Sequence, residues 1–584
     1  MGALLRCKEL TKDGVLLLAP TGKARVKLGR MAKSTAFTVA QFLRKQKRYN
    51  WVKRKPLFEG DSKYRAEKTV VIDECSMLTI EDLYAVFQAM DLVHVTRVIL
   101  VGDPSQLPPI GAGRPFADIC KYLDPTQKQA EDDEERKFAS NVLAKLSVIV
   151  RQANNQEDSD TLKLAAWFSG GEVEPNSDSI FDKLSTPELL NDLDVRLWKT
   201  PEELNNMLLE AMKNELCLAS EDDIAGFNKA LGFINDDGWK YPFNNPNGAE
   251  NFQIISPVNN PPWGNFKINR FIQEKFRGAK LQNARRKREL CLGDQQIVVY
   301  DKVMQNINEE REGYRGKDLP NEEHIIANGE IGIVCNSVSN KYLNVAFCGR
   351  PNLTFGYAKY EFQDGEGPLD LAYSISVHKS QGSDFKKVFL ILPKTCPIIS
   401  RELLYTALTR SKERLILLIE GENPSWIFDL SNAKYSETSR RNSHLFFPSM
   451  RLKSDSVPYA EHLIHTTEKE GLLVRSKSEV IIVNMLHREG VLFEYERKFV
   501  GDFEPGTRRP DFSFEAPGGD LIIWEHLGML HRESYRRSWE EKKKFYAANG
   551  FIEGDNLFTT MDDERGTVDI KEVKETIKKV KALL

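Results

Sequence analysis

Three short apolar runs in the first 110 residues each end in polar side chains, and this pattern constrains the fold most strongly. The runs are VLLLA (15–19), TVVID (69–73) and RVILVGD (97–103). Helical stretches separate them, which is typical of a doubly wound α/β sheet whose parallel strands are buried on both faces. Such sheets bind ligands at the carboxyl ends of their strands, so we expect a site in the polar residues after each run.

Composition narrows the function classes only slightly. The chain has 584 residues, with 82 Lys plus Arg against 85 Asp plus Glu, so its net charge of −3 does not indicate nucleic-acid binding and any basic track must be local. The eight cysteines contain no CxxC pair and favour reduced thiols over disulfides or a zinc site. No apolar run approaches the length of a membrane span and no leader pattern is visible, so we expect a cytoplasmic protein without a membrane partner.

The chain length predicts several domains. Between Leu292 and Phe362, short β-like runs broken by Gly and Asn predict a small β-barrel inserted into a second α/β region. The polar stretch NAKYSETSRRNSH (432–444) predicts a linker. The expected boundaries are 1–140 for the first α/β domain, 141–291 with 363–431 for the second, 292–362 for the barrel, 432–470 for the linker and 471–584 for a C-terminal α/β domain.

Two adjacent carboxylates, Asp73 and Glu74, stand at the end of the second apolar run in TVVIDECSM. Such a pair in a cleft suits phosphoryl transfer, because one carboxylate can order a hydrated Mg²⁺ while the next orients a water. Taken alone, the same residues also fit a strand followed by a capped helix. The neighbouring motifs favour the first interpretation.

Four motifs in chain order make the pattern specific. They are DECS (73–76), GDPSQLPP (102–109), SVHKSQGSDF (376–385) and LLYTALTRSKERL (403–415). In this order they resemble motifs II, III, V and VI of superfamily 1 helicases of the RecD-like 1B branch. APTGKA (19–24) resembles motif Ia, and NGEIGIV (328–334) also matches that branch. The resemblance covers about residues 1–425 and implies two RecA-like parallel-sheet domains of the P-loop NTPase fold, an SH3-like barrel, and an ATP-dependent helicase that moves 5′ to 3′ on single-stranded DNA.

The resemblance implies ATP and Mg²⁺ as cofactors and assigns roles to several residues. Asp73 would hold Mg²⁺, Glu74 would be the general base and Gln106 would sense the γ-phosphate. Arg410 would reach across from the second domain to neutralise charge on the transferring phosphoryl group. The implied nucleotide-binding set is Asp73, Glu74, Gln106, Gln381, Gly382 and Arg410.

Arg151 in VRQAN matches the family's other arginine, although an isolated arginine of this kind also fits a surface ion pair. The DNA-contacting set implied by the resemblance is Thr21, Gly22, Lys23, Thr38, His378, Lys379 and Ser380. His378 by itself would equally fit a core histidine. The basic run KLQNARRK (280–287) fits both a solvated helix face and a DNA track. The barrel would grip or split a duplex, so duplex junctions are a second expected partner.

The phosphate loop of these ATPases is missing from the printed sequence. The family needs GxxxxGK followed by Ser or Thr, and no stretch of the chain matches. In the family that loop is followed by a helix, a turn and the strand ending in APTG, and residues 1–14 fit the helix and turn. We therefore expect the chain to begin just after its phosphate loop, through a misplaced start or a genuine truncation, and not to hydrolyse ATP as it stands.

The C-terminal region resembles the PD-(D/E)xK nuclease superfamily. Pro510-Asp511 and Glu525 match its pattern, and Glu479 lies on a preceding helix, so the resemblance implies a metal set of Glu479, Asp511 and Glu525 for phosphodiester cleavage. Leu527 stands where the pattern has Lys. The candidates to replace that lysine are Lys542, Lys543 and His526.

Several alternatives stay open. The C-terminal region could be an active nuclease, a degenerate nuclease fold kept for DNA binding, or an unrelated α/β domain; Trp524 and Trp539 are expected in its core. The alternatives to a helicase are a DNA-binding protein without catalysis and a metal-dependent nuclease that the helicase part supplies with substrate. The sequence does not separate DNA repair from defence or mobile-element roles, and it gives no indication of protein partners.

Overall fold

The computed structural model separates into two compact units. The first comprises Met1–Ala165, Asn191–Glu422 and Ser436–Met450, and the second comprises Ala166–Leu190, Asn423–Tyr435 and Arg451–Leu584. The structure describes residues 14–50, 55–58, 67–124, 141–146, 159–171, 177–186, 190–233, 248–286, 288–314, 322–338, 340–350, 353–362, 367–441, 443, 445–446, 463, 465–469, 472–530, 533–563 and 567–584. Across these ranges, no helix combines the length and apolar character needed to cross a membrane.

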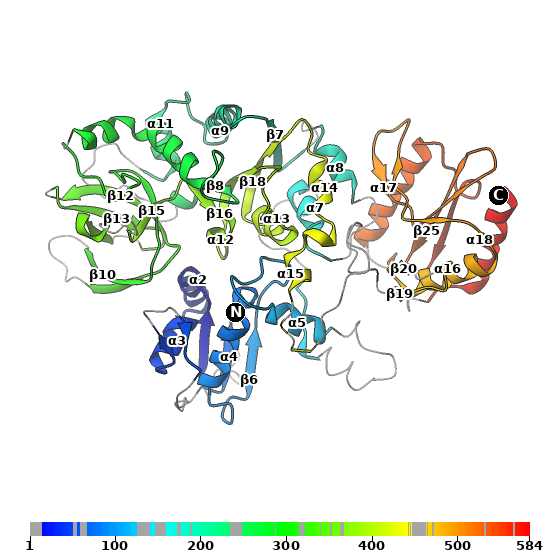
Figure 1. The fold of residues 1–584 in the computed structure, drawn as a ribbon, viewed down its shortest axis with the longest axis horizontal. Helices are drawn as coiled ribbons and strands as arrows, with labels where there is room; N and C mark the ends of the chain where they lie inside the picture. The colour runs from blue at the N-terminus through cyan, green and yellow to red at the C-terminus, as the bar shows by residue number, and fades with distance from the viewer. Residues whose placement is uncertain are drawn as a thin grey trace. The chain divides into compact units, whose positions relative to one another are not determined.

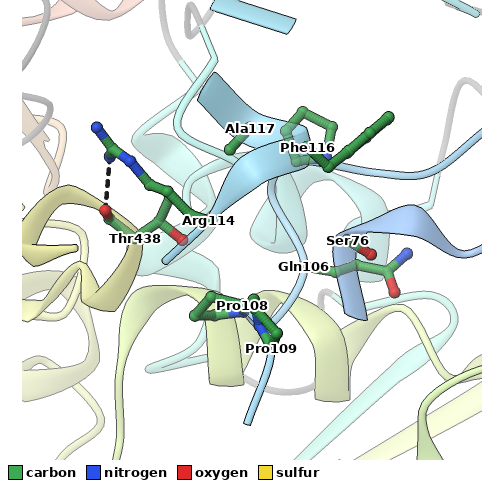
Figure 2. A pocket seen from close by; sticks show the side chains of 9 residues that line it. Ser76, Gln106, Pro108, Pro109, Arg114, Phe116, Ala117 and Thr438 are labelled. Carbon is green, nitrogen blue, oxygen red and sulfur yellow. Dashed lines mark hydrogen bonds between the residues drawn. The ribbon is translucent and has the colours of Figure 1, made fainter. Parts of the chain in front are cut away.

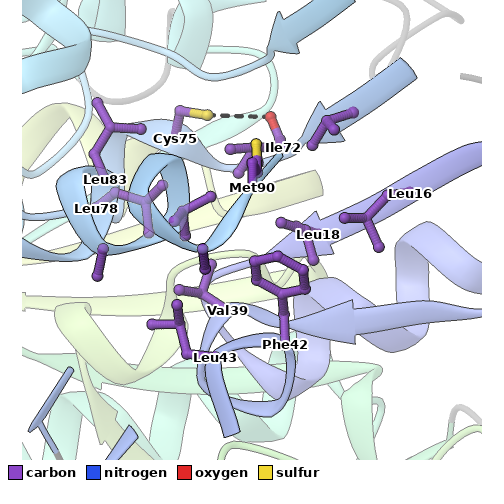
Figure 3. Close-up of a cluster of buried hydrophobic side chains, with 14 of the residues drawn as sticks. Leu16, Leu18, Val39, Phe42, Leu43, Ile72, Cys75, Leu78, Leu83 and Met90 are labelled. Carbon is purple, nitrogen blue, oxygen red and sulfur yellow. Dashed lines mark hydrogen bonds between the residues drawn. The ribbon is translucent and has the colours of Figure 1, made fainter. Parts of the chain in front are cut away.

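The first unit begins with the predicted parallel sheet (Figure 1). Its strands run in the order β2-β1-β5-β6, and every pair is parallel. Alternate strand residues face opposite sides: Leu16, Leu18 and Ile72 pack with helices α3 and α4, as Figure 3 shows, whereas Leu17 and Val71 pack with α2. The elements are β1 (Val15–Ala19), α2 (Gly22–Ala32), β2 (Ala36–Thr38), α3 (Val39–Lys45), β3 (Tyr49–Asn50), β4 (Lys55–Pro56), β5 (Thr69–Ile72), α4 (Ile80–Ala89), β6 (Arg97–Leu100) and α5 (Pro115–Tyr122).

A second, five-stranded parallel sheet follows in the same unit. Its strand order is β16-β8-β17-β18-β7, and β8 is buried along its whole length. Both sheets therefore have the α/β architecture expected of RecA-like helicase domains. The elements are α7 (Asp160–Ala166), β7 (Leu193–Trp198), α9 (Pro201–Glu215), α10 (Ile224–Ala230), β8 (Phe252–Ser256), α11 (Asn265–Arg285), β16 (Ser374–Ser376), α12 (Val377–Ser380), β17 (Phe385–Leu392), α13 (Arg401–Leu408) and β18 (Ser411–Glu420).

The inserted β region is an antiparallel sheet of seven strands. Its order is β11-β10-β14-β13-β12-β9-β15. The described strands show no pairing between the end strands β11 and β15, so closure into a barrel stays a prediction. The strands are β9 (Lys302–Gln305), β10 (Glu309–Tyr314), β11 (Glu322–Ile326), β12 (Ile331–Val338), β13 (Tyr342–Phe347), β14 (Thr354–Ala358) and β15 (Leu369–Leu371).

Lys302 at the start of β9 is fully buried where the inserted sheet meets the second parallel sheet. Its Nζ donates to the carbonyl of Phe252 at 2.8 Å and to Oε1 of Gln253 at 2.9 Å. Burial lowers the pKa of Lys302 to about 7. No carboxylate is among these hydrogen-bond partners, so the charged form is poorly compensated in the folded state.

Stability should therefore rise with pH between about 7 and 10, by up to ~1.4 kcal/mol per pH unit, because the unfolded chain binds the extra proton in that range. The substitution Lys302→Met keeps a similar volume and removes this titration. Urea unfolding of both proteins at pH 7, 8 and 9 should give a smaller pH dependence for the variant. Equal pH dependence in the two proteins would contradict this assignment.

The second unit is built on a four-stranded sheet in the order β21-β24-β25-β26, in which only the β25–β26 pair is parallel. Trp524 and Trp539 are buried in its core, as predicted. Residues 166–190 and 423–435, which the sequence places with the second α/β domain and the start of the linker, group with this unit. Its elements are α8 (Ser179–Lys183), α14 (Trp426–Asp429), β19 (His465–Thr466), β20 (Leu473–Val474), α16 (Lys477–Arg488), β21 (Glu494–Tyr495), β22 (Phe499–Val500), β23 (Thr507–Arg508), β24 (Phe512–Glu515), β25 (Leu521–Leu527), α17 (Glu533–Ala548), β26 (Leu557–Met561) and α18 (Ile570–Leu583).

Part of the predicted linker is packed against the first unit. We call residues 436–441, 443 and 445–446, which include α15 (Glu437–Arg440), the strap. The buried carboxylate of Glu402 on α13 accepts hydrogen bonds from the hydroxyl of Ser436 and the backbone N–H of Glu437. At the other end, Arg441 donates to the carbonyls of Pro109 and Gly111 at 2.6 and 2.9 Å. The strap therefore joins the second parallel sheet's helix α13 to the loop after β6.

Candidate nucleotide, DNA and nuclease-like sites

The turn after β5 presents both predicted carboxylates at the carboxyl edge of the first sheet. The N–H of Asp73 donates to the carbonyl of Leu18 at 2.9 Å, which holds the end of β5 against β1. Glu74 has a φ of 53°, and its N–H donates to Oδ1 of Asp73 at 3.0 Å. A positive φ is unfavourable for a non-glycine residue and occurs often at functional turns. Both side chains are half-buried, and their roles toward Mg²⁺ and water stay predictions.

The loop after β6 brings three of the predicted motifs together. Oδ2 of Asp103 accepts from the hydroxyl of Tyr405 at 2.9 Å and from Nε2 of Gln106 at 3.3 Å. The N–H of Leu107 donates to Oγ1 of Thr406 at 2.9 Å. Nε2 of Gln381 in turn donates to the carbonyl of Leu107 at 3.4 Å. The GDPSQLPP, SVHKSQG and YTALTR segments therefore share one hydrogen-bonded junction.

A pocket lies beside this junction (Figure 2). Gln106 and Ser76 line one part of it, while Arg114 points toward the strap and donates to the carbonyl of Thr438 at 2.6 Å. The other lining residues are Pro104, Pro108, Pro109, Phe116 and Ala117. Sequence reasoning identified Gln106 and missed Arg114, because the partner of Arg114 lies in a segment expected to be a linker.

Arg410 does not extend toward the first sheet. It is only 2% exposed, and its guanidinium donates to the carbonyls of Thr406 and Ser383 at 2.8 and 3.0 Å. A third hydrogen bond joins Nη2 to Oγ1 of Thr409 at 3.0 Å. Its role toward nucleotide stays a prediction and would require these bonds to be exchanged. Arg151 lies outside the described residues.

Three of the predicted DNA contacts use their hydroxyls inside the fold. Thr21 caps α2 by accepting from the N–H of Ala24 at 3.2 Å. Thr38 is 2% exposed and forms a capping box with Gln41 at the start of α3. Ser380 donates to the carbonyl of Val377 at 2.7 Å. The T-x-x-Q spacing at 38–41 is a known capping signature, so this role of Thr38 was readable from the sequence.

The predicted cations of the DNA face are paired with carboxylates. Nζ of Lys23 lies 2.5 Å from Oε1 of Glu250, and Nζ of Lys379 lies 3.1 Å from Oδ2 of Asp370. Outside the predicted set, Lys27 one turn along α2 pairs with Asp384 at 3.2 Å. These cations therefore already have anionic partners before any phosphate is bound.

The remaining residues of the predicted DNA and nucleotide sets also lie near this face. Gly22 contacts the inserted sheet so closely that an added Cβ would lie 1.9 Å from the Cβ of Ala327. Gly382 has a φ of +70°, which favours glycine. His378 is half-buried, and burial lowers its pKa, so the ring is neutral at pH 7.

A separate polar centre lies in the second unit, where β24 begins and β25 ends. Nζ of Lys542 on α17 lies 2.8 Å from Oε1 of Glu525, which also accepts from the hydroxyl of Tyr546 at 2.7 Å. Oδ2 of Asp511 accepts from the N–H of His526 at 2.6 Å. Burial, with the nearby carboxylates of Glu525 and Glu479, raises the pKa of Asp511 well above its usual range. Burial disfavours the charged form of Lys542, but Glu525 and Asp511 outweigh it and raise the pKa of the lysine.

Of the three candidates for the missing lysine, Lys542 is the one that contacts Glu525. Lys543 pairs instead with Glu553 at 2.5 Å. The ring of His526 contacts Oγ1 of Thr560 at 2.9 Å and Oδ1 of Asp562 at 3.0 Å. Lys542 therefore best fits the position that the nuclease pattern leaves empty.

Glu479 on α16 uses its carboxylate in hydrogen bonds to neighbouring hydroxyls. It accepts from the hydroxyls of Ser476 and Tyr495 at 2.8 and 2.5 Å. Within the described ranges, no group of three or more His, Cys, Asp or Glu side chains is arranged to hold a metal ion. The expected set of Glu479, Asp511 and Glu525 is therefore not seen as a ligand cluster. The metal-binding roles of Glu479, Asp511 and Glu525 stay predictions.

Comparisons with known proteins match several parts of this chain. Residues 1–171 match the model of an AAA domain, and residues 371–418 match that of the UvrD-like helicase C-terminal domain. The chain is 24% identical over 454 residues to the RecBCD enzyme subunit RecD of Haemophilus influenzae, covering 71% of this chain and 64% of that protein. It is 25% identical over 402 residues to the ATP-dependent RecD2 DNA helicase of Deinococcus radiodurans, covering 68% and 42%.

A longer match extends through the C-terminal unit. The chain is 28% identical over 570 residues to an uncharacterized protein of Methanocaldococcus jannaschii, covering 92% of this chain and 44% of that protein. Among solved structures, Bacteroides Pif1 bound to single-stranded DNA aligns with 71% of this chain and 84% of its own, at 14% identity and a TM-score of 0.33. The chain thus spans between 42% and 64% of the length of these curated relatives.

The two parallel sheets are joined where the GDPSQLPP, SVHKSQG and YTALTR segments meet, an architecture consistent with RecA-like helicase domains. At the level of family, the sequence matches support a RecD-like superfamily 1 helicase.

Proposed function

We propose that the first unit is the motor of an ATP-dependent DNA helicase or translocase that acts on single-stranded DNA. The observation that carries this proposal is the junction in which Asp103 and Leu107 bond Tyr405 and Thr406, because it connects the nucleotide edge of one sheet to a helix of the other. Changes at the nucleotide can then be transmitted between the sheets through direct hydrogen bonds.

In this proposal Asp73 holds Mg²⁺ and Glu74 accepts a proton from the attacking water. Both carboxylates lie at the carboxyl edge of the first sheet, where they fit these roles. Gln106 reports the nucleotide state to Tyr405 through Asp103. ATP, when bound, supplies the phosphoryl group whose transfer drives the cycle. The 5′-to-3′ direction and the action at duplex junctions are proposed from family resemblance.

The test uses the native protein from its source. Its intact mass is measured, and the same sample is assayed for ATP binding and for unwinding of a fork that carries a 5′ single-stranded tail. ATP-dependent unwinding that a Glu74→Gln variant lacks would support the helicase. DNA binding without ATP binding would refute it and favour a DNA-binding protein without catalysis.

The ion pair between Lys23 and Glu250 should compete with DNA. Both side chains are about one-fifth exposed, at 19% and 20%, and the carboxylate of Glu250 occupies one approach to the ammonium of Lys23. The substitution Glu250→Gln should free Lys23 for a phosphate contact. We expect single-stranded DNA to bind several-fold more tightly at low salt. The slope of log Kd against log NaCl concentration should also become steeper by about one, because one more phosphate is contacted.

Fluorescence anisotropy with a labelled oligo-dT at several NaCl concentrations measures both quantities. The matched control is Asp222→Asn, which removes an ion pair to Lys275 from a side chain that is 78% exposed. Unchanged or weaker binding by Glu250→Gln would show that Lys23 does not contact DNA.

A second candidate function belongs to the second unit. We propose that it is a metal-dependent DNA nuclease, because Lys542 on α17 lies 2.8 Å from Glu525 and could replace the lysine that the PD-(D/E)xK pattern has on the strand, at the position of Leu527. Mg²⁺ would supply Lewis-acid assistance and an activated water there. Asp511 and Glu525 would hold it, and Lys542 would orient the carboxylate of Glu525.

A further inference from the structure

Arg508 is a buried cation held by carboxylates from a distant part of the sequence. It is 4% exposed, its Nε lies 3.3 Å from Oδ1 of Asp178, and its Nη1 lies 3.0 Å from Oδ2 of Asp182. Both aspartates belong to the segment at 177–186, which contains α8 and groups with the second unit. The guanidinium also lies over the ring of Phe545 on α17, 4.4 Å from its centroid.

The loop that follows Arg508 leads directly into the nuclease-like centre. The carbonyl of Arg509 accepts from Nζ of Lys542 at 3.2 Å, and Asp511 accepts from the N–H of His526 at 2.6 Å. The loop 508–511 is therefore fixed by the centre's own groups at one end and by α8 at the other. A carboxylate that must be placed within a fraction of an ångström depends on such supporting contacts.

Asp178 is also electrostatically connected to the centre. Burial raises its pKa to about 6, and the charges of Arg508 and Lys542 oppose that rise. Asp178 in turn contributes, after Glu525 and Asp511, to stabilising the charged form of Lys542. The α8 segment is therefore close enough to influence Lys542 as well as to hold Arg508.

We propose that Asp178 and Asp182 are positioning residues of the nuclease-like centre, which hold Arg508 and thereby the loop that presents Asp511 to Glu525 and Lys542. This inference rests on the proposed nuclease function. The centre would then depend on two distant stretches of the chain, because α8 precedes β7, the first strand in sequence of the second parallel sheet, while Asp511, Glu525 and Lys542 lie near the C-terminus. Cleavage by the C-terminal domain would then depend on a segment that lies within the helicase part of the sequence.

The test compares the full chain with its double variant Asp178→Asn/Asp182→Asn, which keeps side-chain size and removes both charges. Two readouts are used: Mn²⁺-dependent cleavage of single-stranded DNA as a function of Mn²⁺ concentration, and hydrogen exchange of peptides covering 507–512 and 523–528. We expect at least tenfold slower cleavage, a higher Mn²⁺ concentration for half-maximal rate, and at least tenfold faster exchange at the amide of His526. The control Asp502→Asn changes an exposed aspartate between β22 and β23 and should behave as wild type.

The two readouts separate this inference from the nuclease proposal. If the wild-type chain does not cleave, the nuclease proposal fails, and the exchange data alone decide whether α8 positions the loop. Unchanged exchange at 507–512 and 523–528 in the double variant would overturn the positioning role. If the double variant does not fold, the single variant Asp182→Asn is used, because it leaves Asp178 paired with Arg508. Its cleavage rate and its hydrogen exchange should change in the same direction but by less. Wild-type exchange in this single variant would overturn the proposal. Rescue by Asp182→Glu, which restores the charge, is expected to return both readouts toward wild type.

Discussion

The purified 584-residue chain should release no more phosphate from ATP in the presence of single-stranded DNA than its Glu74→Gln variant does. The printed sequence has no GxxxxGK followed by Ser or Thr, so it lacks the backbone amides and the lysine that bind the β- and γ-phosphates. The proposed contacts of Asp73 and Gln106 are with Mg²⁺ and the γ-phosphate and do not replace those amides. In addition, Arg410 is buried against Thr406 and Ser383 and would have to rearrange before it could help.

A phosphate-release assay with and without oligo-dT measures this. The Glu74→Gln variant corrects for contaminating ATPase, because it differs from wild type only at the proposed base. Release by wild type that exceeds the variant and rises with DNA would contradict the prediction. Such a result would mean that another stretch of this chain binds the phosphates.

The second prediction concerns the rate of DNA cleavage by the nuclease-like centre. The substitutions Lys542→Ala and Asp511→Asn should each reduce Mn²⁺-dependent nicking by about 10- to 100-fold, the range expected when a metal ligand loses its supporting contact or is itself removed. Lys542→Ala leaves the buried carboxylate of Glu525 without its ion pair, and Asp511→Asn removes a proposed metal ligand.

Lys543→Ala is the matched control, since Lys543 is adjacent in sequence but pairs with Glu553. Nicking of a supercoiled plasmid is compared among the four proteins at equal Mn²⁺, and their unfolding midpoints are measured to confirm that each is folded. An equal loss of nicking activity in Lys542→Ala and Lys543→Ala would contradict a specific role of Lys542. No cleavage by the wild-type chain with either Mg²⁺ or Mn²⁺ would refute the nuclease.

Both parallel sheets could be predicted because their strands are short apolar runs that end in polar residues. The fold of β1 and β5 follows from burial on both faces, which is a local property of the sequence, whereas the edge strand β6 is only half-buried. The placement of Asp73 and Glu74 follows from the same rule, since the carboxyl end of a parallel strand opens onto a site. The predicted five-part division of the chain remains a prediction, because the structure groups residues only into two units.

The choice among Lys542, Lys543 and His526 could have been narrowed further by helix periodicity. Tyr535, Trp539, Lys542 and Tyr546 recur at intervals of three and four, so they share one face of α17, and all four are buried. Lys543 points about 100° away from Lys542 on the same helix. A lysine on the apolar face of a helix is unusual unless it has an acidic partner, which here is Glu525.

Other features could not be predicted because they depend on contacts between residues distant in sequence. The hydrogen bond from Arg508 to Asp182 spans 326 residues, and no local pattern in α8 indicates it. The burial of Arg410 likewise depends on Ser383, which approaches it from another loop. The pairing of Lys23 with Glu250 spans 227 residues, so no local pattern could indicate it.

The strap has a mechanical consequence for the motor. It is anchored to α13 through Glu402 and to the loop after β6 through Arg441, so it connects one element of each parallel-sheet region. Only the stretch from Glu437 to Arg441 separates these anchors, and a short peptide of that kind has little slack. The strap therefore limits how far α13 can move from the loop after β6 while both anchors hold, and a larger separation must release one of them.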